Sequence, residues 1–309
     1  MLTRLCSCMA RSCMERHETG KSHASSGAPP GSHFRRALVT GATSGIGAAF
    51  ADILPATTDL LLTARNEEKL ADAARRLSRG GRAVEIIAAD LANEDDIARV
   101  VSRADAFGID LLINNAGIGR VGRIVDNPAK AERDTAAVNV LAVVLLTRGL
   151  LPGMIARARS TASRGGVIVV ASTAAFVPVP YFATYAASKA FDLSFAEALG
   201  EEMRGEPIDV LALCPGATRT NFGRRAGSTV MEAPGAADPR TVARQALRAL
   251  GRQRIKVTGG LSEAAFSPFL LPRRLITFGL GALMHIAAAT RSGSNDQGET
   301  RMGGSRSAT

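Results

Sequence analysis

Tyr185 and Lys189 are the side chains in this sequence best suited to moving a proton. Their spacing of four places both on one face of a helix, so the phenol and the ammonium can address one small volume. A nearby cation stabilises a phenolate and lowers the phenol pKa from about 10, toward the range in which it exchanges a proton with an alcohol or a carbonyl. Ser172, thirteen residues earlier, could hydrogen-bond the same oxygen. The alternative is a surface helix with an ordinary tyrosine and lysine.

A glycine-rich segment, Thr40–Gly47 (TGATSGIG), could hold a phosphate group. It follows an apolar strand pattern and opens a helical one, so the helix amino terminus would present free N–H groups and a positive dipole end. Gly41 permits the sharp turn out of the strand, Gly45 lets the backbone approach a pyrophosphate, and Gly47 lets the helix pack closely on the sheet. A glycine cluster alone could be a plain turn, but its place between a strand and a helix favours a dinucleotide-binding turn.

Arg65 stands where the second predicted strand ends and bears on the choice of cofactor. In a dinucleotide-binding fold this position faces the adenosine ribose, where a carboxylate would bind the 2′-hydroxyl of NAD. The chain has a guanidinium instead, which suits a 2′-phosphate. Thr43 and Ser44 add no basic side chain, so the preference rests on Arg65. We therefore expect NADP(H) rather than NAD(H), the alternative being that Arg65 only solvates the helix that begins at Glu67.

Short apolar runs alternate with longer helical patterns between residues 36 and 213. The predicted strands cover 36–40, 59–64, 83–88, 110–114, 166–171 and 208–213, and the predicted helices cover 46–54, 67–78, 94–106, 130–157 and 184–204. Strands that are almost wholly apolar indicate a parallel sheet covered on both faces. Right-handed crossovers then give an α/β fold with a single Rossmann-type, doubly wound parallel sheet and no second domain. Ligands bind at the carboxyl ends of such strands, where Asp90–Leu91 and Asn114–Gly117 lie.

Taken in order and spacing, these motifs resemble those of the short-chain dehydrogenase/reductase family. The resemblance runs from about residue 34 to residue 220 and, less specifically, to about residue 258. It is carried by the following residues: Thr40–Gly47, Asp90–Leu91, Asn114–Gly117, Asn139, Ser172, Tyr185, Lys189 and Pro215–Gly216. The fold that the resemblance implies is the same doubly wound sheet.

The resemblance also implies a role for each matching residue. Tyr185 would be the catalytic acid and base, and Lys189 would lower its pKa and hold the nicotinamide ribose. Ser172 would orient the substrate oxygen, and Asn139 would hold a water that relays protons through Lys189. Thr218 departs from the family, which often has a β-branched aliphatic residue there. The predicted cofactor-binding residues are Gly41, Thr43, Ser44, Gly45, Ile46, Gly47, Arg65, Asp90, Leu91, Asn115, Ala116, Gly117, Tyr185, Lys189, Pro215, Gly216, Thr218 and Thr220.

The composition of the chain excludes several other classes of protein. The net charge is +10, but the basic residues are spread along the chain and aromatic residues make up only 4%, so we expect no nucleic-acid partner. The longest apolar stretch, Leu275–Ala289, is shorter than the roughly 20 residues that a membrane span needs. Three of the four cysteines lie in the first 13 residues without the paired spacing of zinc modules. We therefore expect no metal and a reducing, cytoplasmic location.

The ends of the chain differ in composition from its centre. Residues 1–33 are rich in Ser, Gly, His and Arg and predict a disordered extension, as do the Gly-, Ser- and Arg-rich residues 291–309. Residues 34–270 would form the catalytic domain, in which Asn221–Pro239 would be a lid over the substrate. Residues 271–290 predict an apolar helix that covers the cleft or a neighbouring subunit, and peripheral contact with a membrane is the less favoured alternative.

These features together predict an enzyme: an NADP(H)-dependent oxidoreductase that interconverts a carbonyl and an alcohol by hydride transfer. We expect a small-molecule substrate and a homodimer or homotetramer. The alternative function is a non-catalytic NADP(H)-binding sensor on the same fold. The presence of Ser172, Tyr185 and Lys189 together favours the enzyme, since a sensor would have no use for all three.

Overall fold

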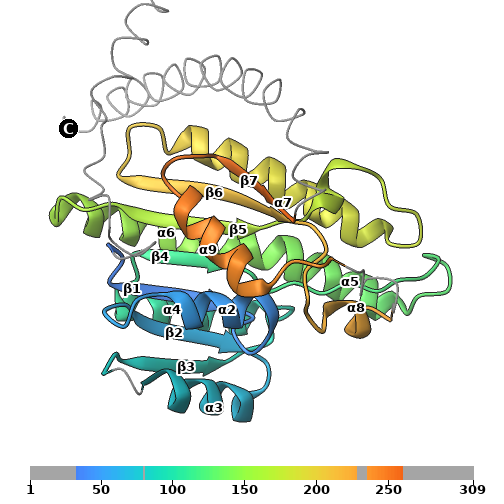
Figure 1. Cartoon of the computed structure of the whole chain (residues 1–309), viewed down its shortest axis with the longest axis horizontal. Coiled ribbons are helices and arrows are strands. Elements are labelled where there is room, and N and C mark those ends of the chain that lie inside the picture. Colours follow the sequence, from blue (N-terminus) through green and yellow to red (C-terminus); the bar gives the residue numbers. More distant parts are fainter. Residues whose placement is uncertain (1–32, 79–80, 228–234, 260–309) are drawn as a thin grey trace, which may run out of the picture. The chain divides into compact units, whose positions relative to one another are not determined.

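Seven parallel strands form one sheet at the centre of the structure (Figure 1). The computed structural model describes residues 33–78, 81–227 and 235–259. The strands are β1 (Arg36–Thr40), β2 (Asp59–Ala64), β3 (Val84–Ala88), β4 (Leu111–Asn114), β5 (Gly165–Val170), β6 (Ile208–Pro215) and β7 (Ile255–Thr258). Their order across the sheet is β3-β2-β1-β4-β5-β6-β7, so the chain moves outward from β1 to β3 and then returns to the other side of β1. In open parallel sheets such a reversal opens a crevice at the carboxyl ends of the strands.

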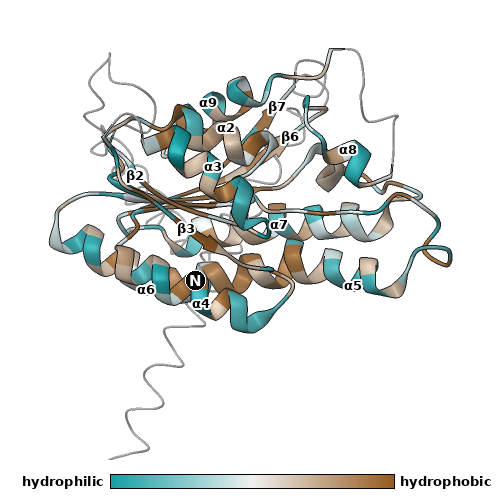
Figure 2. Ribbon diagram, turned by 90° about the horizontal axis from the view of Figure 1, so that it is seen from below, coloured by the Kyte–Doolittle hydropathy of each residue, from teal (hydrophilic) through white to brown (hydrophobic). Residues whose placement is uncertain are grey.

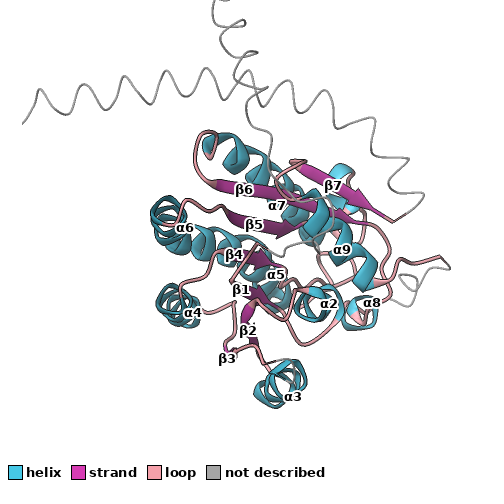
Figure 3. Ribbon diagram, turned by 60° about the vertical axis from the view of Figure 1, so that its left-hand side comes forward, coloured by secondary structure: helices cyan, strands magenta, loops and turns pink. Residues whose placement is uncertain are grey.

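Helices cover both faces of the sheet (Figures 2 and 3). One face is covered by α2 (Gly45–Ile53), α3 (Glu67–Leu77) and α9 (Pro239–Ala249), and the other by α4 (Glu94–Phe107), α6 (Ala142–Ser160) and α7 (Ala183–Glu202). Side chains of each strand alternate between the two layers: in β1, Ala37 and Val39 pack against the first set of helices and Leu38 packs against the second. Because both faces are buried, the strands contain few polar residues.

The predicted fold class is confirmed, since the sheet is single, parallel and covered on both faces. All six predicted strands are present, but β7 and α9 were not predicted. β7 has only four residues and includes Lys256, so its apolar pattern is too short to recognise. α9 carries a recognisable start signal, because Asp238 accepts a hydrogen bond from Thr241 N and Pro239 occupies the first helical position.

The long helix predicted over 130–157 is confirmed as a continuous helix over Ala129–Ser160, which consists of three joined segments. A π-helical turn, η2 (Ala137–Leu141), links α5 (Ala129–Ala136) to α6, and such turns often occur at functional sites. Within the described residues, the combined helix Ala129–Ser160 is the one helix long and apolar enough to cross a membrane. Half of its most apolar window is buried inside the protein, where α6 packs on α4 and β5.

Some predicted segments lie outside the described residues. These are the extension at 1–33 apart from His33, residues 228–234 of the lid, residues 260–270 of the catalytic domain, the apolar helix at 271–290 and the tail at 291–309. Their structure stays a prediction, as do the cytoplasmic location and the homo-oligomeric assembly.

The hydroxyl group of Thr40 ties the end of β1 to the end of β4. It accepts hydrogen bonds from the backbone N–H groups of Asn115 and Ala116, both at 2.9 Å, and donates one to Ile113 O at 3.2 Å. Asn115 Nδ2 donates a further hydrogen bond to Thr40 O at 2.8 Å. These bonds fix the distance between the two strands on either side of the chain reversal.

We predict that Thr40→Val lowers the free energy of unfolding by about 2–4 kcal/mol. Valine keeps the shape but leaves two half-buried backbone N–H groups without an acceptor, each in the lower part of the range of about 1–3 kcal/mol. Thr63 offers a matched control. It lies opposite Thr40 on β2, is fully buried, and its hydroxyl oxygen has no hydrogen-bond partner in the described part of the protein. Thr63→Val should therefore leave the free energy of unfolding unchanged or raise it. Urea unfolding measures both variants, and equal losses in the two would contradict the role given to the Thr40 hydroxyl.

Candidate active site

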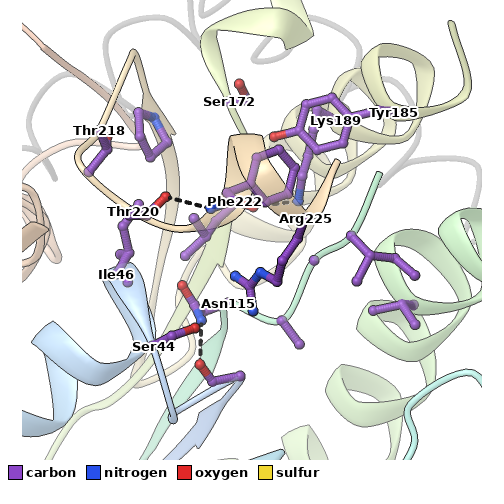
Figure 4. A pocket seen from close by; sticks show the side chains of 18 of the residues that line it. Ser44, Ile46, Asn115, Ser172, Tyr185, Lys189, Thr218, Thr220, Phe222 and Arg225 are labelled. Carbon is purple, nitrogen blue, oxygen red and sulfur yellow. Dashed lines mark hydrogen bonds between the residues drawn. The ribbon is translucent and has the colours of Figure 1, made fainter. Parts of the chain in front are cut away.

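A cleft of about 690 Å³ opens at the carboxyl ends of the strands (Figure 4). All the predicted site residues line it except Gly47 and Asn139. Gly47 lies just beneath the cleft, because a Cβ placed on it would strike Asn115 and Gly41. Asn139 is fully buried on η2 and bonds to the loop that follows β4. The topology thus brings together residues that lie up to 179 positions apart, from Gly41 to Thr220.

One face of α7 carries three ionisable side chains in a row. Tyr185, Lys189 and Asp192 follow one another at spacings of four and three, and all three are buried. Lys189 Nζ donates hydrogen bonds to Asp192 Oδ2 and to Val170 O, both at 2.8 Å. The same Nζ lies 5.9 Å from the centre of the Tyr185 ring. Asp192 was not predicted as a site residue, although its position one turn after Lys189 was a usable signal.

Burial is the largest influence on the phenol of Tyr185. It raises the pKa, and the Lys189 ammonium and a hydrogen-bond interaction with Ser172 lower the pKa without cancelling that effect. The net pKa therefore lies above its usual value, which corrects the expectation of a lowered one. The sequence spacing between Tyr185 and Lys189 predicted that a cation lies near the phenol, but it did not predict that the phenol is shielded from solvent. Burial also opposes the charge of Lys189, but Asp192 and Tyr185 outweigh it and raise the pKa of the ammonium.

Ser172 and Asn139 support the cleft from two sides. The hydroxyl of Ser172, just after β5, accepts a hydrogen bond from Ala174 N at 3.1 Å. Asn139 holds the loop after β4, because its Oδ1 accepts a hydrogen bond from Ile118 N and its Nδ2 donates one to Ile118 O, both at 2.9 Å. Asn139 Nδ2 also donates to Ser188 Oγ on α7 at 2.9 Å. The side chain of Asn139 thus braces one wall of the cleft, and its part in a proton relay stays a prediction.

The glycine-rich turn after β1 forms a cradle. Gly41 and Gly45 have φ angles of +66° and +59°, which residues with a Cβ rarely adopt. Gly47 lets α2 approach Asn115 more closely than any side chain would allow. Ser44 precedes α2 without making a side-chain capping hydrogen bond, so its hydroxyl and the first N–H groups of the helix can bind a phosphate. The turn therefore fits the pyrophosphate of a dinucleotide.

Three cationic side chains line the same cleft: Arg65 after β2, Lys69 on α3, and Arg225 on the short helix α8 (Phe222–Arg225). None of the three forms a salt bridge with an acidic side chain in the described ranges. Arg225 points into the cleft (Figure 4), and burial together with the charge of Arg65 lowers its pKa. Only Arg65 was predicted here. Asp90 also lines the cleft, and Asp134 lies within electrostatic range of Arg65, but neither forms an ion pair with the three cations, whose grouping favours the binding of an anion.

Aromatic side chains line the part of the cleft next to Tyr185. Phe182 stacks on Tyr185 with ring centres 4.3 Å apart, and the ring of Phe222 lies 5.2 Å from that of Tyr185. The other members of this apolar cluster are Val121, Ala174, Val179 and Ala226. These side chains form an apolar wall, so an apolar group would fit beside the phenol. Phe182 was missed because its role depends on burial, although it lies one helical turn before Tyr185.

We predict that Tyr185 titrates above the ordinary phenol value of about 10 in the cofactor-free protein. The chain has two tyrosines and no tryptophan, so Tyr181→Phe leaves Tyr185 as the sole source of tyrosinate absorbance in the ultraviolet. Tyr181 is exposed, so this change should leave the cleft intact. Adding Lys189→Met should raise the midpoint further, because it removes the cation that favours the phenolate. A midpoint below about 10 in the Tyr181→Phe protein would show that burial is not the dominant influence.

Comparison with known proteins places these observations in a family. The family model described as short chain dehydrogenase matches residues 35–230. The dehydrogenase/reductase SDR family member 7B of Rattus norvegicus is 32% identical over 236 residues, which are 74% of this chain and 69% of the relative. The very-long-chain 3-oxoacyl-CoA reductase of Laccaria bicolor is 33% identical over 198 residues, which are 59% of this chain and 56% of that protein. The chain thus spans little more than half the length of the fungal relative.

A solved structure shares the same architecture. The short-chain dehydrogenase from Sphingobium yanoikuyae in complex with NADPH is similar to this chain with a TM-score of 0.67 and 27% identity, covering 88% of this chain and 98% of the other. The matched family range, residues 35–230, includes the glycine-rich turn and the Tyr185–Lys189 pair. This chain therefore belongs to the short-chain dehydrogenase family.

Proposed function

We propose that this protein is an NADP(H)-dependent oxidoreductase that interconverts an apolar carbonyl compound and the corresponding alcohol. The observation that carries the proposal is the meeting of three features in one cleft: the Tyr185–Lys189 pair, the glycine cradle after β1 and the aromatic wall. The pair can move a proton, the cradle can hold a dinucleotide, and the wall can hold the apolar part of a substrate. No single one of these features would support the proposal alone.

The cradle and the three cations support NADP(H) as the cofactor. The first N–H groups of α2 and the Ser44 hydroxyl would bind the pyrophosphate. Arg65, Lys69 and Arg225 would bind the 2′-phosphate, a group that NAD(H) lacks and that a guanidinium recognises well. The relative from Sphingobium yanoikuyae, which binds NADPH, also supports this choice.

Tyr185 is the proton donor when a carbonyl compound is reduced. Its hydroxyl gives a proton to the substrate oxygen, and Lys189 and Ser172 stabilise the phenolate that remains. When bound, the nicotinamide cofactor supplies or accepts the hydride. Because the pKa of Tyr185 lies above its usual value, the phenol keeps its proton at neutral pH, which favours reduction. Alcohol oxidation needs the phenolate first, so its rate should increase with pH.

The aromatic wall supports a substrate with an apolar group next to its carbonyl. Phe182 and Phe222 lie against Tyr185 and form an apolar surface beside the phenol. The relative from Laccaria bicolor, a very-long-chain 3-oxoacyl-CoA reductase, also supports an apolar chain as the substrate.

A non-catalytic NADP(H)-binding sensor is the alternative function. A sensor needs the cradle and the cations, but it needs no proton donor beside an apolar wall. The buried stack of Phe182 on Tyr185 therefore favours the enzyme. Oxidation of NADPH in the presence of uncharged ketones, aldehydes and 3-oxoacyl thioesters separates the two functions, since a sensor would bind NADPH and turn over none of them.

We predict that Arg65→Ala raises the dissociation constant for NADPH about tenfold to a hundredfold, because a hydrogen bond to a charged group contributes about 1.5–3 kcal/mol. Arg225→Ala should also raise the dissociation constant for NADPH. The dissociation constant for NADH should stay unchanged in both variants, because NADH has no 2′-phosphate. Arg252→Ala, an exposed change outside the cleft, is the control. Cofactor fluorescence measures all four proteins, and equal affinity of the unmodified protein for NADPH and NADH would contradict the assignment.

We predict that Tyr185→Phe lowers kcat for carbonyl reduction by at least about a hundredfold, the usual contribution of a general acid. The ring still packs against Phe182, so NADPH binding should be retained. The matched control is Tyr181→Phe, which removes the same hydroxyl from an exposed ring and should keep kcat. If Tyr185→Phe retained more than a few per cent of the activity, the proton would have to come from another group.

A further inference from the structure

Asp192 is a fully buried acidic side chain to which the proposed reaction gives no part. It lies on α7 one turn after Lys189 and is 0% exposed. Its Oδ2 accepts the hydrogen bond from Lys189 Nζ, whereas its Oδ1 has no hydrogen-bond partner in the described residues. Burying a carboxylate with an unpaired oxygen is costly, and a buried ion pair is often no more stable than apolar side chains of the same volume. Packing alone therefore does not account for Asp192.

The contacts of Lys189 show what Asp192 does. Asp192 Oδ2 and Val170 O each accept one of the three N–H donors of the ammonium, both at 2.8 Å. The third donor is left for the cleft, which Lys189 lines. Burial alone would favour the neutral amine, and Asp192 is the strongest of the groups that raise the pKa of Lys189 against burial.

Few other charged groups face this pair. Tyr185 on the same helix and the Cys214 thiol on β6 also raise the pKa of Lys189, and they act more weakly than Asp192. The 3-10 turn η3 (Thr173–Phe176), the π turn η2 and strand β5 also pack against α7, and none of them carries a charged side chain. Strand β6 packs against α7 as well, and its one acidic side chain, Asp209, pairs with Arg164. The charged side chains of α5 bond to one another or to Asn127. Asp192 is therefore the counter-charge of Lys189 within the described part of the chain.

We propose that Asp192 is a positioning residue that holds the Lys189 ammonium, charged and at a fixed place, on the edge of the cleft. It does not touch the substrate and acts mainly through Lys189, although its charge also raises the pKa of Tyr185. The proposal rests on the proposed function insofar as it gives Lys189 a part in proton transfer. With the carboxylate in place, Lys189 stays available to stabilise the phenolate at every pH at which Tyr185 can give up its proton.

Lysine NMR tests this proposal without turnover. The chain has five lysines, Lys21, Lys69, Lys130, Lys189 and Lys256, so lysine-selective ¹³C labelling gives few signals, and a Lys189→Met sample assigns the one of interest. Asp192→Asn keeps an oxygen acceptor for Nζ but removes the negative charge. An opposite charge at this range shifts a pKa by about 1–3 units. The ammonium of Lys189 in Asp192→Asn should therefore lose its proton at a pH about one to three units lower than in the unmodified protein. An unchanged Lys189 titration would overturn the proposal.

Glu197 supplies a matched control on the same helix. It is also a buried acid, and it lies five residues beyond Asp192. Glu197→Gln should leave the titration of Lys189 unchanged, because the effect depends on the direct contact with Nζ. A shift as large as that of Asp192→Asn would overturn the proposal, since any buried carboxylate of α7 would then have the same effect.

The pH profile of carbonyl reduction gives the second readout. In Asp192→Asn the alkaline limb of kcat should move to lower pH by about one to three units, while KM for the carbonyl compound changes little. Loss of thermal stability with both the Lys189 titration and the alkaline limb unchanged would show that Asp192 only packs, and would overturn the proposal. If the unmodified protein reduced no carbonyl compound, the proposed function would fail, and the NMR titration would still decide the role of Asp192.

Discussion

The charge of a buried ammonium is the constraint on which this site depends. Lys189 is only 4% exposed, so protein groups must replace the water that would otherwise surround its charge. The carbonyl of Val170 at the end of β5 and the carboxylate of Asp192 on the same helix do so, and the bond to Val170 ties α7 to the carboxyl end of the sheet. Rotating or sliding α7 would break one of these bonds. Because Tyr185 lies on the same helix face, the requirement that places the ammonium also places the phenol.

The loop after β4 connects this helix to the cradle. At its start, Asn115 and Ala116 bond to the hydroxyl of Thr40 on β1. At its end, Ile118 bonds to the side chain of Asn139, which in turn bonds to α7. Between these tethers, a Cβ on Gly117 would lie 3.4 Å from Lys189 Nζ, so the loop passes directly beside the ammonium. The four loop residues 115–118 thus fix the cofactor side of the cleft relative to the side that transfers the proton.

Features of the site that depend on short spacings could be predicted from the sequence. The glycine turn and the Tyr185–Lys189 pair are of this kind, because helix periodicity and the strand–turn–helix order determine them. Arg225 lies in the segment expected to cover the substrate, but its place beside Arg65 was not predictable in this way, since α8 reaches the cleft only through the tertiary fold. The predicted direction of the shift in the Tyr185 pKa was wrong, because a spacing of four residues says nothing about the burial of the phenol. The π turn at Asn139 was hidden inside a continuous apolar helical pattern.

Hydride transfer from labelled cofactor tests the central claim most directly, namely that this cleft passes a hydride and a proton to a carbonyl compound. The protein would be incubated with an uncharged apolar ketone and NADPH in which both hydrogens on the reactive nicotinamide carbon are replaced by deuterium, and the product would be read by NMR and mass spectrometry. The account predicts one deuterium at the carbinol carbon of each product molecule and none on its oxygen. Binding of NADPH without any labelled alcohol across a panel of apolar ketones would contradict it.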